Sequence, residues 1–346
     1  MVIKGVITDA AFFEMKNKTN KIDKEQIEGY IDLSRKLKVN KLITISNEFV
    51  SDPSHSPVKL KSTKYFSLLH FSWTYLITKG QLLLIDNEEN ISSPDQEEIM
   101  QEALHYFENP LSGIRGYTQM KPGWKELSEN VRAQNILKPN DVIIEEAVQS
   151  WYEEEKDIAL LVSRSLGVLV KSTTRNSDSQ KKDMKRLAEH NYISGNLSIK
   201  GAASDIKITA EFERRTLLMS IKITPPLDKG PKARITWICK QLENLKRKSE
   251  EAFVSIENDI WIEADIKYAK DHIKVKISEL DNLATLSQGK EIQAFHIVYI
   301  KSLGANFSST KKFIVIIEDM ILDYYEAIVQ FATTWTRPTP KLNQEQ

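Results

Sequence analysis

The hydrophobic pattern near the N-terminus predicts two strands separated by one helix. Residues 2–16 carry an almost continuous apolar run from Val6 to Phe13, which is typical of a strand that is buried on both faces. Residues 41–46 form a second short apolar strand. Because the links between the elements are short, we expect the two strands to pair in parallel through a right-handed crossover.

The intervening helix has a clear start signal. Asp23 is a suitable N-cap, and Gln26, three residues later, completes a capping-box pattern. Apolar residues then recur at helical spacing from Ile27 to Val39, so the pattern predicts a helix of about four turns that ends before Asn40.

The hydrophobic pattern predicts mainly helices in the middle of the chain and both strands and helices after Gly167. After a loop at 47–64 it predicts a strand at 65–73 and then helices at 74–85, 95–108, 123–134 and 141–166. Beyond Gly167 we expect a basic helix at 179–191, strands at 205–212 and 216–223, a helix at 231–248, strands at 260–268, 272–277 and 292–300, and a helix at 310–336. The strands at 205–212 and 216–223 alternate apolar and polar residues, which predicts a hairpin with one solvent-facing side.

These elements predict a fold of the mixed class in three segments. Residues 1–115 form an α/β domain, residues 116–167 a helical connector, and residues 168–346 an α+β domain with an antiparallel sheet.

The composition is that of an ordinary soluble protein, with 41% hydrophobic and 28% charged residues among 346 and a net charge of zero. No stretch approaches the roughly 20 apolar residues of a membrane span. Asp9, Glu14 and Lys16 interrupt any signal-peptide core. The single cysteine, Cys239, excludes an internal disulfide and a cysteine-based zinc site. We therefore expect a cytoplasmic protein without membrane contact.

Charge is unevenly distributed along the chain. Residues 171–248 hold 18 Lys/Arg against 8 Asp/Glu, a balance of +10, whereas residues 141–157 hold seven acids against Lys156 alone. Such segregation indicates an electrostatic footprint, for DNA among other partners, or an intramolecular or intersubunit contact, but solvated faces of helices and a hairpin explain the same residues better. The candidates for phosphate contact are Lys181, Lys182, Lys185, Arg186, Arg214 and Arg215, with 246–248 as a further basic run.

The residue pair that most clearly suggests a chemical role lies at the end of the first predicted strand. Glu14 and Lys16 are two positions apart, so their side chains point to the same face of the strand. Metal-dependent hydrolysis of phosphodiesters needs a carboxylate for a hard divalent cation and gains from an ammonium group near the phosphate. The alternative reading is a surface ion pair at a strand end.

Two residues of the following helix extend this pair. Gln26 and Tyr30 are four positions apart, hence on one helix face, and the helix starts beside the end of the strand where ligands of open α/β sheets collect. Gln26 is equally a capping-box partner of Asp23, and Tyr30 is equally a core residue.

Glu-x-Lys followed by Gln-x-x-x-Tyr resembles the RecB-like branch of the PD-(D/E)XK nuclease superfamily. A closer resemblance is to a bacterial stress response protein family with a nuclease-like N-terminal region. It is carried by FFEMKNKTNKIDKEQIEGYIDLSRKLKVNKLITISNEFV, PSHSPV, LHFSWTYLIT and SGIRGYTQM, and more loosely by residues 301–307. The resemblance implies a partial restriction-endonuclease-like core in residues 1–115, with Glu14 binding Mg²⁺, Lys16 stabilising the phosphate, and Gln26 and Tyr30 orienting the site.

The chain departs from that family pattern at one metal ligand. The superfamily places an aspartate on the strand before Glu-x-Lys, and here Asp9 is the nearby acid, five positions before Glu14 and so on the opposite face of a continuous strand. Asp9 remains a candidate second metal ligand, but loss of the usual first strand, or its location in an upstream segment, explains the pattern better. His55, in a proline-flanked loop, is a candidate phosphate contact.

Two functions follow from these observations. The first is a magnesium-dependent deoxyribonuclease acting in stress response or phage defence. The second is a nuclease-derived adaptor with an incomplete site, which binds nucleic acid or a protein through its basic C-terminal part.

Overall fold

The computed structural model describes residues 2–3, 6–7, 9–50, 54, 56–58, 60, 65–85, 93–175, 177–269 and 272–336. The chain forms two compact units, residues 1–190 with 308–315 and residues 191–307 with 316–346. The segment 116–167, expected as a connector, is part of the first unit. None of the described helices is long and apolar enough to cross a bilayer.

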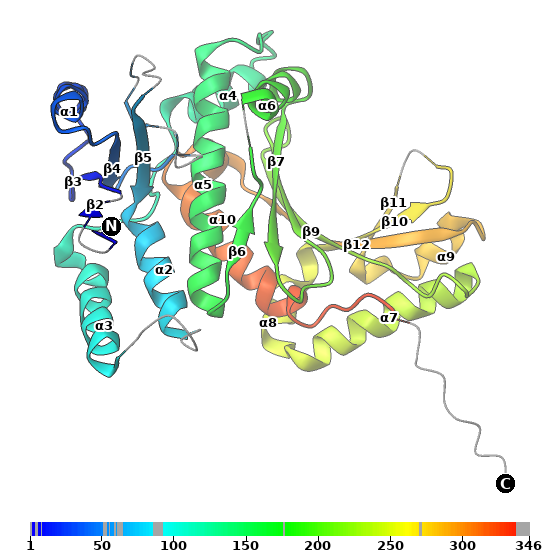
Figure 1. Cartoon of the computed structure of the whole chain (residues 1–346). Helices are drawn as coiled ribbons and strands as arrows, with labels where there is room; N and C mark the ends of the chain where they lie inside the picture. The colour runs from blue at the N-terminus through cyan, green and yellow to red at the C-terminus, as the bar shows by residue number, and fades with distance from the viewer. Residues whose placement is uncertain are drawn as a thin grey trace. The chain divides into compact units, whose positions relative to one another are not determined.

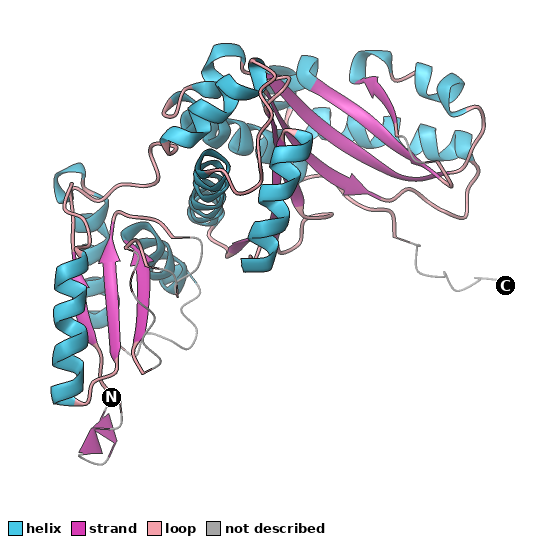
Figure 2. Cartoon of the chain, turned by 90° about the horizontal axis from the view of Figure 1, so that it is seen from above, coloured by secondary structure: helices cyan, strands magenta, loops and turns pink. Residues whose placement is uncertain are grey.

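A three-stranded parallel sheet forms the centre of the N-terminal region. Its strands β3 (Phe12–Met15), β4 (Lys41–Ser46) and β5 (Ser67–Ser72) lie in that order, and both pairings are parallel. The parallel pairing of β3 with β4 was predicted, and that of β4 with β5 was not. Figure 2 shows these arrows side by side and pointing in the same direction. Helix α1 (Lys24–Leu37) connects β3 to β4, and the Asp23 side chain caps it by accepting a hydrogen bond from the backbone N–H of Glu25 at 3.0 Å.

The first strand differs from its prediction. Instead of one strand over 2–16, β1 (Val2–Ile3) and β2 (Val6–Ile7) form a small antiparallel pair, and β3 follows separately. The expectation of burial on both faces is wrong for β3, because Phe13 and Met15 are each 54% exposed. In the described sheet β3 is an edge strand, so fewer neighbours cover it.

Helix α1 packs on one face of this sheet. Ile22, Ile27 and Leu42 are buried at the centre of the contact. Phe12 and Tyr30 pack against them, with ring centroids 5.6 Å apart. Burial of these side chains is the main source of stability that holds the helix against β3 and β4.

Helices make up most of the remaining first unit. They are α2 (Trp73–Ile85), α3 (Pro94–Glu108), the short η1 (Pro110–Ser112), α4 (Pro122–Arg132), α5 (Val142–Leu166) and α6 (Ser177–His190), with strand β6 (Val170–Ser172) between the last two. Trp124 of α4 stacks on Trp151 of α5, with ring centroids 6.2 Å apart, and its ring lies 4.6 Å from that of Phe313. These three aromatic side chains pack together between α4, α5 and the start of α10.

The second unit is built on an antiparallel sheet. Its strands run in the spatial order β11 (Ile273–Lys276), β10 (Ile260–Ile266), β12 (Ile292–Ser302), β9 (Thr216–Ile223), β8 (Ile206–Glu211) and β7 (Tyr192–Ile199). The predicted antiparallel pairings β8–β9 and β10–β11 are confirmed. The mixed fold class, with a parallel and an antiparallel sheet, is therefore as expected.

Helices cover one face of this antiparallel sheet. They include α7 (Pro231–Lys248), α8 (Glu250–Ile256), α9 (Asn282–Ser287) and α10 (Lys312–Tyr324), and a π-helical turn (Tyr325–Val329) follows α10. Figure 1 shows α7 and α9 on one side of β10 and β12. Trp237 of α7 stacks over Phe295 at 6.5 Å, and the Tyr324 hydroxyl donates to the Ile297 carbonyl at 2.6 Å and accepts from the Ile221 N–H at 3.0 Å.

Helix α5 carries a buried acid, Asp157, whose carboxylate is only partly satisfied by hydrogen bonds. Oδ2 of Asp157 accepts a hydrogen bond from the Tyr117 backbone N–H at 2.7 Å, whereas Oδ1 has no hydrogen-bond partner among the described residues. Burial raises the pKa of the Asp157 carboxyl to about 6, although the Tyr117 N–H and the Arg164 charge oppose the rise. Because the folded state holds this proton more tightly than the unfolded chain does, Asp157 reduces stability as pH rises from about 4 to 6.

We expect Asp157→Asn to be more stable than the wild-type chain at pH 8, by about 2 kcal/mol, because the neutral amide avoids burying a charge. The advantage should shrink at pH 5, where the folded wild-type carboxyl is already protonated. Urea unfolding at both pH values measures the difference, with Asp32→Asn as the control on an exposed helix face. An equal gain at pH 5 and pH 8 would show that the charge of Asp157 is not the cause.

Candidate functional site

The four residues proposed as a catalytic group lie together in the first unit. Glu14 Oε1 is 2.8 Å from Lys16 Nζ, and Glu14 Oε2 accepts a hydrogen bond from the Tyr30 hydroxyl at 2.8 Å. The Gln26 side chain also hydrogen-bonds to the Glu14 carboxylate. We call Glu14, Lys16, Gln26 and Tyr30 the Glu14 cluster.

The donors around Glu14 stabilise its ionised form. Partial burial raises the pKa of the Glu14 carboxyl, but the hydrogen bonds from Lys16, Tyr30 and Gln26 and the Lys16 charge outweigh burial and lower it overall. The same contact with Glu14 raises the pKa of the Tyr30 phenol, which stays protonated as a donor. The cluster is thus a carboxylate held by one ammonium and two neutral donors.

A polar row extends from Glu14 across the sheet. Glu14, Thr44 and His70 are paired in register on β3, β4 and β5, so their side chains share one face. The Thr44 hydroxyl is 2.9 Å from His70 Nδ1, and His70 Nε2 is 2.8 Å from the Glu48 carbonyl oxygen. Burial lowers the pKa of His70, and the neutral ring with its hydrogen on Nε2 satisfies both contacts.

Asp9 lies apart from this cluster. Its carboxylate binds Lys41 Nζ at 2.7 and 2.8 Å, at the start of β4, whereas Glu14 pairs with Thr44 further along the strand. The hydrogen bond from Lys41 lowers the pKa of Asp9. Asp9 is therefore engaged in an ion pair of its own and does not complete a ligand pair with Glu14.

The Glu14 cluster offers one carboxylate to a magnesium ion. Magnesium takes oxygen ligands in octahedral geometry, and each oxygen of Glu14 already accepts from one donor, Lys16 or Tyr30. Across the described ranges no three His, Cys, Asp or Glu side chains are grouped so that they could hold a metal ion. His55, the proposed phosphate contact, lies outside the described residues.

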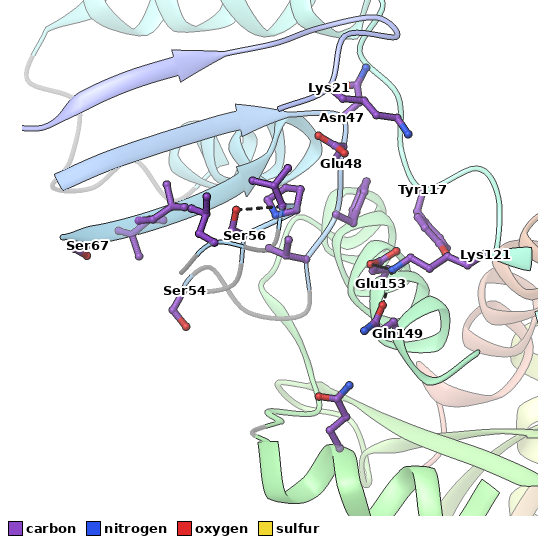
Figure 3. A pocket seen from close by; sticks show the side chains of 18 of the residues that line it. Lys21, Asn47, Glu48, Ser54, Ser56, Ser67, Tyr117, Lys121, Gln149 and Glu153 are labelled. Carbon is purple, nitrogen blue, oxygen red and sulfur yellow. Dashed lines mark hydrogen bonds and ion pairs between the residues drawn. The ribbon is translucent and has the colours of Figure 1, made fainter. Parts of the chain in front are cut away.

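A cavity of about 920 Å³ opens near the carboxyl end of β4 and is not lined by the Glu14 cluster. One wall is apolar, and the other end carries polar side chains, among them Asn47, Glu48, Tyr117, Lys121, Gln149 and Glu153 (Figure 3). Lys121 Nζ lies 2.6 Å from Glu153 Oε1 and 3.1 Å from Gln149 Oε1. Burial raises the pKa of Glu153, and the Lys121 charge opposes this. The volume of the cavity is in the range of small-molecule sites.

The basic residues proposed for DNA contact have different environments. Lys181 and Lys182 are exposed on α6, whereas Lys185 lies 3.8 Å from Glu189 and Arg186 lies 3.2 Å from Asp183. Arg214 and Arg215 form the turn between β8 and β9, in the second unit. In the run 246–248, Lys246 binds Glu257 at 2.9 Å. The proposed residues therefore lie on three elements, α6 in the first unit and the β8–β9 turn and α7 in the second.

One face of the second unit's sheet points away from the described helices that pack on the other face. We call it the open face; it contains Lys207, Ser220, Lys222, Trp261, Glu263, Lys274, Lys276, His296 and Val298, and Val298 at its centre is buried. The register arranges these side chains in two rows across the strands. One row runs Lys207, Ser220, Val298, Trp261 and Lys276, and the next runs Lys222, His296, Glu263 and Lys274.

Each row begins and ends with a lysine. The acidic side chains Glu263 and Asp265 lie between these lysines. Lys274 binds Glu263 at 2.8 Å, and Lys222, whose side chain is 54% exposed, lies 3.4 Å from Asp265. Asp265 also binds His272 at 2.7 Å and His296 at 3.1 Å. Lys207 and Lys276 are exposed and form no ion pair with any residue for which the structure gives a side chain.

Sequence reasoning missed this open face. Each of its lysines stands alone between apolar residues, so no basic run marks it, and only the pairing register brings the four together. The alternation of apolar and polar residues along β8, β9, β10 and β11 was the signal in the sequence that could have indicated this face. The alignment of His70 with Glu14 was likewise not predicted, because it depends on the register of three strands.

No family model, curated protein or solved structure matches this chain. The resemblance to PD-(D/E)XK nucleases and to a stress response family therefore stays a prediction, and the arguments that follow rest on geometry.

Removing the Tyr30 hydroxyl tests the electrostatics of the Glu14 cluster. We expect Tyr30→Phe to lower the free energy of unfolding at pH 7 by about 1 kcal/mol, since it removes a hydrogen bond to a charged group. The folded-state pKa of Glu14 is depressed, so this contribution is present above the pKa of the unfolded chain and lost as pH falls through the folded value.

Urea unfolding of Tyr30→Phe at pH values from 7 down to 2.5 measures this effect, because the folded pKa of Glu14 lies below the ordinary glutamate value. Tyr106→Phe, at an exposed position of α3, is the matched control and should leave the free energy of unfolding unchanged at every pH. A loss for Tyr30→Phe that is the same at every pH would contradict a role for the Glu14 charge.

Proposed function

We propose that the protein binds nucleic acid through phosphate contacts on the open face of its second unit and does not cleave it. The observation that carries the proposal is the pair of cross-strand rows that end in Lys207, Lys276, Lys222 and Lys274. Phosphate neutralisation by lysines is the main source of sequence-independent affinity for nucleic acids.

The balance of charge on this face supports the proposal. Four lysines stand against Glu263 and Asp265, which lie between them, so two positive charges remain before the histidines are counted. Lys207 and Lys276 lie on β8 and β11, four strand spacings apart, a span of about 19 Å. Cations this far apart reach different phosphates along a chain, whereas one bound anion would use only one of them.

The state of Glu14 argues against the nuclease alternative. A metal-dependent nuclease needs carboxylate oxygens that are available to the cation. Here Lys16 and Tyr30 hold both oxygens of Glu14, and Asp9 is paired with Lys41. Binding without hydrolysis requires none of these contacts to break.

We expect the double variant Lys207→Ala/Lys276→Ala to bind DNA more weakly and with a shallower dependence on salt. The slope of log K against log salt should fall by about 1.5, because each lost phosphate contact removes about 0.7 to 0.9. Fluorescence anisotropy with a labelled oligonucleotide between 50 and 300 mM KCl, in EDTA, would measure both quantities for the full chain.

The matched control is Lys24→Ala/Lys125→Ala, which removes the same charge from exposed helix positions of the first unit. It should leave the slope unchanged. If both double variants lower affinity and slope equally, net charge and not the open face governs binding, and this proposal fails.

We also expect no cleavage of single- or double-stranded DNA with Mg²⁺ or Mn²⁺ at protein concentrations that saturate binding. The physical reason is the occupied Glu14 carboxylate. Gel analysis over hours checks this. Metal-dependent cleavage that disappears in Glu14→Gln would contradict the proposal and restore the nuclease assignment.

A further inference from the structure

The open face carries the large aromatic side chain of Trp261. Trp261 lies on β10 between Ile260 and Ile262, which are buried on the helix-covered side. Alternation therefore places the indole on the opposite side, among lysines and other polar residues. A tryptophan in this place is partly exposed to solvent, whereas a core residue would face the helices.

Two ammonium groups lie over this ring. Lys274 Nζ and Lys276 Nζ are each 5.5 Å from the centroid of the Trp261 indole. Lys276 pairs directly across from Trp261, and Lys274 follows in the next row. The structure thus combines a partly exposed aromatic ring with two cations that rest on it through cation–π contacts.

This combination distinguishes between forms of nucleic acid. In a duplex the flat faces of the bases are stacked on one another, and a protein reaches only phosphates and base edges. In a single strand the base faces are free, and each base that stacks on an aromatic side chain contributes about 1 to 3 kcal/mol. A base that stacks on Trp261 would replace the ammonium groups that lie over the ring, and the two displaced lysines would bind the phosphates that flank the base.

We propose that the ligand of the open face is single-stranded nucleic acid, with a base stacked on Trp261 and its neighbouring phosphates bound by Lys274 and Lys276. This inference rests on the proposed function, because it names the class of nucleic acid that the same face binds. The chemistry is shared by single-stranded DNA and RNA, because stacking uses the face of the base and phosphate contacts use the backbone, which both have.

The test compares three labelled ligands of one sequence, single-stranded DNA, single-stranded RNA and duplex DNA, with the full chain at constant salt. Trp261→Leu should weaken binding of the single strands about tenfold, the equivalent of one stacked base, and leave the duplex unchanged. Trp261→Phe should recover part of the loss, since it keeps an aromatic face. Binding should also quench tryptophan fluorescence of the wild-type chain more than that of Trp261→Phe.

Tyr106→Leu is the control, since this aromatic residue is exposed on α3 in the first unit, and it should bind all ligands as the wild type does. Thermal melting identifies variants that fail to fold, and Trp261→Phe keeps the test open if Trp261→Leu is one of them.

The outcomes separate the two proposals. If single strands bind but Trp261→Leu and Trp261→Phe bind them as tightly as the wild type, stacking is excluded and nucleic-acid binding stands. If duplex DNA binds more tightly than both single strands, the ligand class proposed here is wrong. If neither form binds even at 50 mM salt, the proposed function itself fails. Loss with one single strand only would assign the site to DNA or to RNA.

Discussion

Side-chain alternation along β-strands is the constraint on which both units depend. Every second residue of a strand must face the same side, so a strand whose odd positions fill a core presents its even positions to the opposite surface. In the second unit this buries Ile221, Ile262 and Ile297 beneath helices and leaves the lysines of the open face together. Residues that are far apart in sequence thereby become a single surface.

The same constraint in the first unit leads to a different chemical result. Glu14, Thr44 and His70 share a face, but the helix that covers it brings Tyr30 and Gln26 to the carboxylate. A carboxylate satisfied by three donors is a structural anchor that ties α1 to β3, and it stays ionised without a metal.

Local patterns predicted much of this structure, and non-local pairing accounts for what they missed. The spacing of Glu14, Lys16, Gln26 and Tyr30 was sufficient to predict their meeting, because strand and helix periodicity fix which side chains share a face. Strand β7 was not predicted, since Gly195 and Asn196 resemble a turn, and its buried positions Ile193 and Leu197 are recognisable only beside β8. The open face was beyond prediction for the same reason, as its rows depend on the register of five strands.

The most direct test of the account is photochemical cross-linking of the full chain to a single-stranded oligonucleotide, followed by mass spectrometry of the linked peptides. The account predicts that the links concentrate in residues 260–276, which hold β10 and β11 with Trp261, Lys274 and Lys276. Links confined to α6, around Lys181 and Lys182, or spread evenly over both units, would contradict it.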